Sequence, residues 1–221
     1  MYTLAFDTTA AACSIILLKD KTTISKFSKT MDFGQSELLI PEIKNILDSQ
    51  NLKISDLDLI GVCSGPGSFT GVRASVSAAR AFALACPQVS VCGVSAFESY
   101  ARELEEDPMQ IAEHNLVVIE TKRDDFYYQI FDKHLQKETL PQAGHFEDIL
   151  ANLRDGRKVT VIGDGAERFL NKPTGLSLHN IIMSEALDIR NVALTAIRHF
   201  ENKNMDFPKP IYLRAPDVCL K

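Results

Sequence analysis

Short apolar or β-branched runs separated by polar turns occupy the first part of the chain. Five of them, at residues 2–6, 12–18, 22–28, 59–63 and 89–94, have the length and composition of strands. The first three follow one another closely, with Lys19-Asp20-Lys21 as one of the turns between them. We therefore predict strands at these positions and an antiparallel meander for the first three.

Elsewhere apolar residues recur every three or four positions, which is the period of a helix. This period predicts helices at residues 36–50, 96–105, 146–153 and 186–200. A further helix follows a glycine-rich loop and runs to about Ala85, before Pro87. Helices and strands thus alternate along the chain, which predicts an α/β or α+β fold rather than an all-helical one.

The acidic segment Glu105-Glu106-Asp107-Pro108 is the best candidate for a linker. Beyond it, residues 116–120 and 126–132 have the pattern of paired strands, residues 159–163 that of another strand, and Asp164-Gly165 that of a turn. We expect a first lobe at residues 1–105 and a second, smaller lobe at residues 106–221. No internal repeat stands out in the sequence.

Composition and charge narrow the class of protein. The chain has 221 residues, 45% of them apolar, which is enough to form a hydrophobic core in one large domain or in two small lobes. The net charge is −5, so the chain has no overall positive charge with which to bind nucleic acid. The start, MYTLAFDTTAAACS, has no basic segment and no apolar run reaches about 18 residues, so we expect neither a leader nor a membrane span. The cysteines are odd in number and include no Cys-x-x-Cys pair, so we expect reduced thiols and a soluble cytoplasmic protein; they are Cys13, Cys63, Cys86, Cys92 and Cys219.

The loop GPGSFTG places Gly65, Gly67 and Gly71 between a strand and a helix. Its spacing misses the Rossmann fingerprint by one residue, and it lacks the lysine of a P-loop. Two interpretations stay open: the N–H groups at the helix start bind an anion, or the glycines only permit positive φ in a tight turn.

Asp7-Thr8-Thr9, at the end of the first predicted strand, is a second candidate site. An aspartate at a strand end can hold a metal–phosphate group or orient water, and it can equally cap a turn through its carboxylate.

A stripe of small residues marks the helix after the glycine loop. Ala74, Ala78, Ala81 and Ala85 recur at spacings of four, three and four, and Ser77 lies beside them. Small side chains let another backbone approach closely, and that neighbour is either the chain's own sheet, a second helix or another subunit.

Several segments together resemble the TsaB (YeaZ) family, the bacterial partner of TsaD in the synthesis of tRNA threonylcarbamoyladenosine. They are LAFDTTAAACSIILL, QSELLIPEIKNIL, GPGSFTGVRASVSAARAFALA, VIGDGA and PIYLRAP, spread from residue 4 to residue 216. The block at residues 65–73 is the most specific of them, and the part after residue 130 matches weakly. The resemblance implies an actin-like (ASKHA, ribonuclease H-like) fold of two lobes with mixed sheets.

The resemblance also implies a non-catalytic scaffold subunit that binds TsaD and the ATPase TsaE. Their assembly transfers a threonylcarbamoyl group to adenosine 37 of tRNA, which this subunit would meet only through the complex. TsaD carries a metal-binding His-x-x-x-His pair, and no two histidines of this chain are four residues apart. We therefore expect no catalytic residue, no metal site and no cofactor of its own, with ATP and a divalent metal used by the partner subunits.

The same resemblance assigns the docking surface, for TsaD or for a second copy of the chain, to the helices at residues 36–47 and 72–85. The interface residues that it implies are Ser36, Leu38, Leu39, Pro41, Ile43, Val72, Arg73, Ala74, Ser77, Ala78, Ala81 and Ala85. The glycine loop would be inherited from nucleotide-binding relatives, with Asp7, Thr8, Thr9, Gly65, Gly67, Ser68, Thr70 and Gly71 as its vestigial or possible nucleotide residues. Gln35 stands where the family often has a histidine.

Two other functions stay open. A stand-alone actin-superfamily ATPase or kinase would hold ATP and Mg²⁺ with Asp7 and the loop at Gly65. It would also need a catalytic base and a second phosphate loop, for which Asp164-Gly165 is a candidate. A glycoprotease-like peptidase would need a serine, a histidine and an acid; Ser64 and Ser68 are present, but His114 is the first histidine of the chain.

Overall fold

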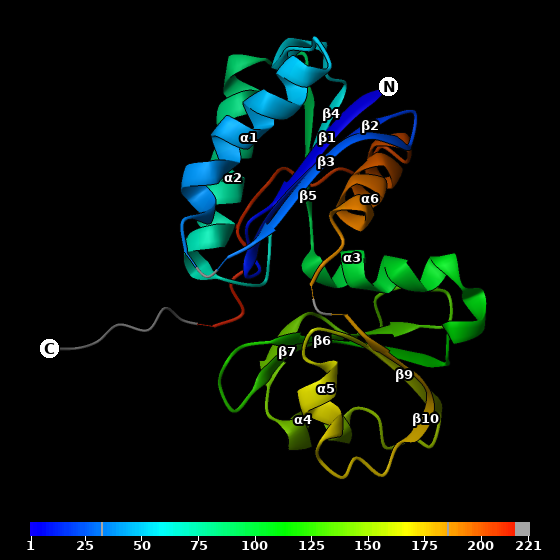
Figure 1. The fold of residues 1–221 in the computed structure, drawn as a ribbon. Helices are drawn as coiled ribbons and strands as arrows, with labels where there is room; N and C mark the ends of the chain where they lie inside the picture. The colour runs from blue at the N-terminus through cyan, green and yellow to red at the C-terminus, as the bar shows by residue number, and fades with distance from the viewer. Residues whose placement is uncertain (32, 185, 215–221) are drawn as a thin grey trace, which may run out of the picture.

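The computed structural model describes residues 1–31, 33–184 and 186–214 of the chain. These residues form two five-stranded sheets, one in the upper lobe and one in the lower lobe of Figure 1, with helices packed against them. Cys219 and the end of the PIYLRAP segment, from residue 215 on, lie outside the described residues.

The first sheet has the strand order β3-β2-β1-β4-β5. Its first three strands form the predicted antiparallel meander, which is thereby confirmed, and β4 and β5 run parallel to β1. The bounds are β1 Tyr2–Asp7, β2 Ala12–Lys19, β3 Thr22–Thr30, β4 Leu59–Cys63 and β5 Ser90–Val94. β1, β2 and β4 are almost entirely buried because both faces of the sheet are covered by helices.

Two helices, α1 (Gln35–Ser49) and α2 (Phe69–Ala85), lie side by side on one face of this sheet (Figure 1). The apolar stripe of α1 meets side chains of β1 and β2 in one cluster, in which Leu39 and Ile43 pack with Phe6. The opposite face is covered by α6 (Ile189–Glu201), the last helix among the described residues.

The second sheet has the strand order β10-β9-β6-β7-β8. Its strands are β6 His114–Glu120, β7 Phe126–Asp132, β8 Gln142–Gly144, β9 Lys158–Gly163 and β10 Ser177–Met183. The short helices α4 (Phe146–Ala151) and α5 (Ala166–Leu170) cover one face, and α3 (Ala96–Glu103) covers the other.

The two halves of the chain repeat one topology. The order β1-β2-β3-α1-β4-α2-β5-α3 recurs as β6-β7-β8-α4-β9-α5-β10-α6, and corresponding strands take corresponding places in the two sheets. The closing helices are exchanged, because α3 packs on the second sheet and α6 returns to the first. The fold is therefore a duplication, although the sequence shows no repeat.

The linker segment, predicted at residues 105–108, lies between the two sheets in chain order, in two 3₁₀ turns at Leu104–Glu106 and Pro108–Gln110. The division into lobes at residues 1–105 and 106–221 stays a prediction. The return of α6 shows that the second half of the chain also supplies a helix to the first sheet.

Three elements of the second half were not predicted: β8, α5 and β10. β8 and α5 are too short to establish a period. The apolar alternation of β10 is broken by an irregularity between Leu178 and Asn180. The last helix begins at Ile189 rather than at residue 186, because Asp188 caps it by accepting a hydrogen bond from the N–H of Arg190, 3.0 Å away.

Candidate functional site: the glycine turns, the interlobe cleft and the outer face of α1 and α2

The glycine loop joins β4 to α2 and lies against the end of β1. A Cβ on Gly71 would overlap the carbonyl oxygen of Thr8, and a Cβ on Gly67 would lie 2.5 Å from the carbonyl oxygen of Thr9. The loop needs glycine at these positions because two backbones touch there. The interpretation of the glycines as a device for a tight turn thus has a direct structural basis.

Most of the polar groups in this turn already have partners within the chain. The N–H of Ser68 donates to Thr9 O at 2.7 Å, and the N–H of Thr8 donates to Ser75 Oγ at 3.0 Å. The hydroxyl of Thr8 lies 2.7 Å from both Gly71 O and Ser75 Oγ. A phosphate cradle depends on N–H groups that point at the ligand, whereas these N–H groups fasten the turn to β1.

Asp7 is 3% exposed, and its carboxylate accepts a hydrogen bond from the N–H of Thr9 at 2.7 Å. Burial raises the pKa of Asp7, although this hydrogen bond opposes the rise. The same buried surroundings raise the pKa of the Cys63 thiol. Asp7 therefore acts in this structure as the cap of the turn at the end of β1.

A second glycine turn, Gly163-Asp164-Gly165, follows β9 and lies against the end of β6. A Cβ on Gly163, whose φ is +119°, would overlap the carbonyl oxygen of Val118. Asp164 Oδ1 accepts a hydrogen bond from the N–H of Glu120 at 2.9 Å. Burial is the main cause that raises the pKa of Asp164 to about 6.

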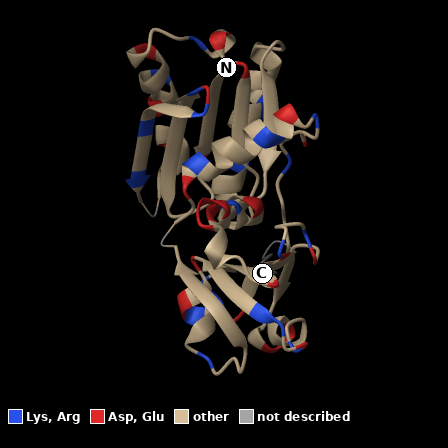
Figure 2. Cartoon of the chain, turned by 90° about the vertical axis from the view of Figure 1, so that its right-hand side faces the viewer, with Lys and Arg blue, Asp and Glu red and all other residues tan. Residues whose placement is uncertain are grey.

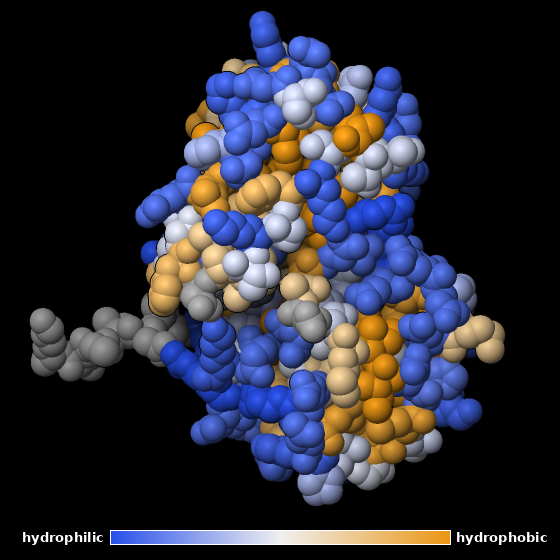
Figure 3. All heavy atoms as spheres, in the orientation of Figure 1, coloured by the Kyte–Doolittle hydropathy of each residue, from blue (hydrophilic) through white to orange (hydrophobic). Residues whose placement is uncertain are grey.

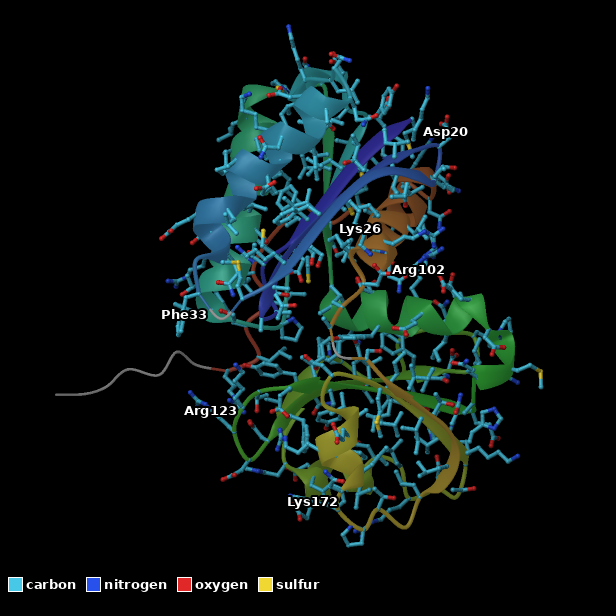
Figure 4. The ribbon with its side chains drawn as sticks, viewed as in Figure 1. Asp20, Lys26, Phe33, Arg102, Arg123 and Lys172 are labelled. Carbon is cyan, nitrogen blue, oxygen red and sulfur yellow. The ribbon has the colours of Figure 1, made fainter. Side chains whose placement is uncertain are left out.

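A cleft of about 880 Å³ lies between the lobes, within the size range of small-molecule sites. Phe33 of the first lobe lines it, and Figure 4 shows Arg123 of the second lobe below Phe33 on the same side of the molecule. The polar side chains that line it come from both lobes: Thr9, Thr30, Gln35, Ser68, Tyr100, Glu120, Thr121, Lys122, Tyr127 and Asp164. Burial and the neighbouring Asp164 raise the pKa of Tyr100, so its phenol stays protonated.

The two helices assigned to docking present one continuous outer face. Of the twelve interface residues implied by the resemblance, Ser36, Pro41, Arg73, Ser77, Ala81 and Ala85 are exposed, and Leu38, Ala74 and Ala78 are half-buried. Three large apolar side chains that the sequence reasoning missed also lie exposed on these helices, Ile40 (48%), Phe69 (43%) and Leu84 (84%). We call the eight residues Ser36, Ile40, Pro41, Arg73, Ser77, Ala81, Leu84 and Ala85 the α1–α2 face.

The assignment of Leu39, Ile43 and Val72 to the interface was wrong. They are 1%, 2% and 1% exposed, and Leu39 and Ile43 pack against the chain's own sheet. The stripe that makes a helix amphipathic can face only one neighbour, and here that neighbour is the sheet. An apolar residue outside the stripe, as Ile40 and Leu84 are, was the signal that could have identified the outer face.

Arg73 is held in place at the start of α2 by two aromatic rings. Its guanidinium lies 3.6 Å from the ring centroid of Phe69, and its Nε donates to Tyr212 Oη at 3.0 Å. Tyr212 belongs to the PIYLRAP segment, so this segment and the block at residues 65–73, both part of the resemblance, meet at this point. Sequence reasoning did not connect Arg73 with Tyr212, because 139 positions separate them.

The histidine considered for a peptidase, His114, has carboxylates at both ring nitrogens rather than Ser64 or Ser68: Nδ1 lies 2.7 Å from Glu138 Oε2 and Nε2 lies 2.9 Å from Asp155 Oδ2. Another set joins Cys92 Sγ to His199 Nδ1 at 3.7 Å and His199 Nε2 to Glu98 Oε1 at 3.6 Å. Cys92 is fully buried on β5, and burial raises the pKa of its thiol to about 12. A thiol in these surroundings does not ionise at neutral pH and has no access to a peptide.

The family model of TsaD, tRNA N6-adenosine threonylcarbamoyltransferase, matches residues 34–194. The chain belongs to this family. Among its relatives, the Escherichia coli tRNA threonylcarbamoyladenosine biosynthesis protein TsaB is 25% identical over 97% of this chain and 95% of its own. The solved structure of YeaZ from Pseudomonas aeruginosa superposes with a TM-score of 0.77 at 21% identity, over 96% of this chain and 99% of that one. The resemblance to TsaB (YeaZ) is thus confirmed.

The actin-like fold is also confirmed. A Bacteroides thetaiotaomicron protein with an actin-like ATPase fold superposes with a TM-score of 0.50 at 11% identity, over 87% of this chain and 95% of that one. Its named relatives place the chain among the proteins of tRNA threonylcarbamoyladenosine biosynthesis.

Neither a cluster of metal ligands nor a membrane-spanning helix occurs among the described residues. Among them, no three His, Cys, Asp or Glu side chains gather as a metal site would require. The helices formed by residues 1–31, 33–184 and 186–214 are all too short or too polar to cross a bilayer.

Proposed function

We propose that this chain is a non-catalytic scaffold subunit of a tRNA threonylcarbamoyladenosine synthase. It docks a TsaD partner through the α1–α2 face and forms with it the platform to which TsaE binds. The observation that carries the proposal is the surface of α2, where Ser77, Ala81 and Ala85 form an exposed small-residue row beside the exposed Leu84.

The physical support for docking is the combination of small and large apolar residues. A row of alanines and serines lets a partner helix approach at short interaxial distance, and Leu84 and Ile40 provide side chains that such a helix can bury. A leucine that is 84% exposed gains little in the isolated chain, whereas its burial in an interface is favourable.

The state of the glycine turns supports a role without catalysis. Thr8, Thr9, Ser68 and Gly71 hydrogen-bond one another or Ser75, so the first turn is built to hold the fold together. We propose accordingly that ATP and a divalent metal act in the partner subunits.

The charge distribution supports indirect contact with tRNA. Acidic residues of α3 and of the turn that follows it lie between the two lobes (Figure 2), where arginines pair with Glu105 and Glu106. The net charge of the whole chain is −5, which disfavours contact with phosphate, so the partner would supply the contacts to tRNA.

The test is binding of the purified chain to the TsaD protein of the same organism. Ala81→Arg places a charge in the small-residue row, and we expect it to weaken the complex at least about a hundredfold, because the charge is buried without a partner. Ala151→Arg is the matched control, since Ala151 is an exposed alanine on α4 in the second lobe. Equal binding by both variants would contradict docking through the α1–α2 face.

One observation favours the alternative of a stand-alone ATPase or kinase: the cleft holds Asp164 and Lys122 on the side opposite Ser68. ATP turnover by the isolated chain, lost in Asp164→Asn, would support that alternative. Absence of turnover, together with TsaD binding, would leave the scaffold function as the better account.

A further inference from the structure

A second pocket lies between the lobes, apart from the cleft described above, with which it shares no lining residue. Its volume is about 360 Å³, within the size range of small-molecule sites. Three parts of the chain line it: the ends of β4 and β5 with the start of α3, the second-lobe residues 137–141, and the segment 206–211 after α6. A ligand in this pocket therefore touches both lobes.

Ser64, directly after β4, places a buried hydroxyl at the inner end of this pocket. It is 3% exposed, and its Oγ has no hydrogen-bond partner among the described residues. Its backbone is fixed, because its N–H donates to Val94 O at 2.8 Å and its C=O accepts from the N–H of Ile211 at 2.9 Å. A buried hydroxyl without a partner is unfavourable. This hydroxyl therefore calls for a polar group that the described chain does not supply.

Gly93 keeps space open beside the hydroxyl. A Cβ at position 93 would lie 2.7 Å from Ser64 Oγ. Three other buried polar atoms of the described residues are unpartnered, on Thr3, Arg102 and Thr195, but these residues line neither the pocket nor the cleft. Ser64 thus differs from them because it lines a cavity that another molecule can enter.

The outer part of the pocket is apolar. Leu140 of the second lobe and Phe207 of the segment after α6 line it and are 80% and 58% exposed. Arg80 holds this segment in place, since its Nε donates to Pro208 O at 2.7 Å. The pocket differs from the apolar stripe that Figure 3 shows on the second lobe, because no unpartnered buried polar atom of the described residues lies in the strands of that lobe. Only the pocket combines apolar walls with a polar group that needs a partner.

Two charged side chains at the pocket are left without an ionic partner. Lys137 Nζ pairs with Glu98 Oε1 at 2.9 Å, and Glu138 pairs with an arginine at 3.0 Å. Asp206 and Lys209 also line the pocket, and they form no ion pair within the part of the chain that the structure describes. The pocket thus presents one carboxylate and one ammonium group that are free. A ligand that carries one group of each charge complements them.

We propose that this pocket binds a free α-amino acid whose side chain ends in an uncharged hydrogen-bonding group, an amide or a hydroxyl. Its ammonium faces Asp206 and its carboxylate faces Lys209, both exposed residues. The carbon atoms of its side chain lie against Leu140 and Phe207, and its polar end completes the hydrogen bonding of Ser64 Oγ. The amino acid thereby ties the lobes together. This goes beyond the proposed function, because docking through the α1–α2 face does not depend on the pocket.

The test is the dissociation constant of L-asparagine and of L-glutamine with the purified chain, measured by NMR titration. We expect values on the order of 1 mM or below. L-leucine and L-methionine have nearly the same shapes but carry no amide, so we expect them to bind at least about tenfold more weakly. Both amides should also raise the melting temperature of the chain, because they bind its folded state.

Two variants separate the polar and the charged parts of the site. Ser64→Ala and Lys209→Met should each raise the dissociation constant of L-glutamine at least about tenfold. The matched controls, which should leave binding unchanged, are Thr195→Val, which removes another unpartnered buried hydroxyl, and Lys203→Met, which removes another exposed lysine after α6. Ser64→Ala removes a group without a partner, so we expect this variant to fold.

Three results would overturn the proposal: no binding of either amide up to about 10 mM, binding of L-leucine or L-methionine as tight as that of the amides, or unchanged binding by Ser64→Ala or Lys209→Met. The first would leave a water molecule as the partner of the Ser64 hydroxyl. None of these results bears on TsaD docking, which Ala81→Arg tests.

Discussion

The two glycine turns occupy equivalent places in the duplicated fold, yet different chemistry fastens them. In each half a turn after the fourth strand lies against the end of the first strand, and a glycine, Gly71 or Gly163, leaves no room for a Cβ. The first turn is fastened by the neutral hydroxyls of Thr8 and Ser75. The second is fastened by the carboxylate of Asp164.

The difference shows which part of the motif the fold requires. Two parallel strands that end side by side bring two backbones into contact, so the glycine is demanded by topology. The side chains that hydrogen-bond each turn can differ between the lobes, and they decide how the stability of each lobe depends on pH and salt. A salt bridge lies next to the second turn: Arg168 donates hydrogen bonds to both carboxylate oxygens of Glu120, at 2.6 and 2.8 Å, beside Asp164.

Replacement of either turn glycine is expected to have the largest effect. Gly71→Ala and Gly163→Ala should each cost more than about 4 kcal/mol of unfolding free energy, because the new methyl group meets backbone that cannot move aside. Soluble yield and urea unfolding measure this. Gly156→Ala is the control: its φ is also positive but nothing lies within 4 Å of a Cβ there, so we expect a cost of about 1–2 kcal/mol. A mild effect at Gly163 alone would mean that the two turns are not equivalent.

Asp164→Asn tests how the stability of the second turn depends on pH. The folded state raises the pKa of Asp164 from 3.8 to about 6, so it binds the proton more tightly than the unfolded chain does. This contribution to stability is complete below pH 3.8 and is lost as the pH rises to about 6.

Asp164→Asn should therefore be more stable than the wild type above pH 6, by up to about 3 kcal/mol, and equal to it near pH 3.8. Urea unfolding across this range measures the difference. A stability difference between variant and wild type that does not change with pH would contradict the buried carboxylate of Asp164 as the cause of that difference.

Thr8→Val tests the hydroxyl fastening of the first turn. The variant keeps the shape of the side chain, which is fully buried, but removes the hydroxyl that hydrogen-bonds Gly71 and Ser75. We expect it to lower the free energy of unfolding by about 2 kcal/mol, and by the same amount between pH 4 and pH 8. Thr195→Val is the matched control, because the hydroxyl of Thr195 is buried and has no hydrogen-bond partner within the described chain. Its removal should be neutral or slightly stabilising; equal losses for both variants would point to packing instead.

The smallest effect is expected for Arg168→Met. Arg168 and Glu120 are each about one-third exposed, so the loss should be about 1 kcal/mol at low salt and less at about 1 M salt. Lys44→Met breaks the more exposed pair with Asp48 and should have almost no effect. Salt-independent losses would show that Arg168 acts by packing on Phe126, whose ring centroid lies 3.7 Å from its guanidinium.

Much of the fold could be predicted because its signals are local. The meander and the apolar stripe of α1 follow from alternation and helical period, which neighbouring residues establish by themselves. The second half was harder to read, since α5 spans only five residues and β10 contains an irregularity. The helices at residues 36–47 and 72–85 were located, but the core residue Leu39 was taken for a surface residue because a period does not say what lies opposite it.

The sequence by itself determined the family, through its motifs, and the main helices and strands. Only the tertiary structure decided that the backbone of Thr8 leaves no room for a side chain at position 71, that α3 and α6 exchange sheets, and that β10 ends the second sheet of the described residues. The physical reason is that these features depend on contacts between distant parts of the chain, such as the 63 positions between Thr8 and Gly71. Such contacts leave no period in the sequence, and they exist only once both backbones are in place.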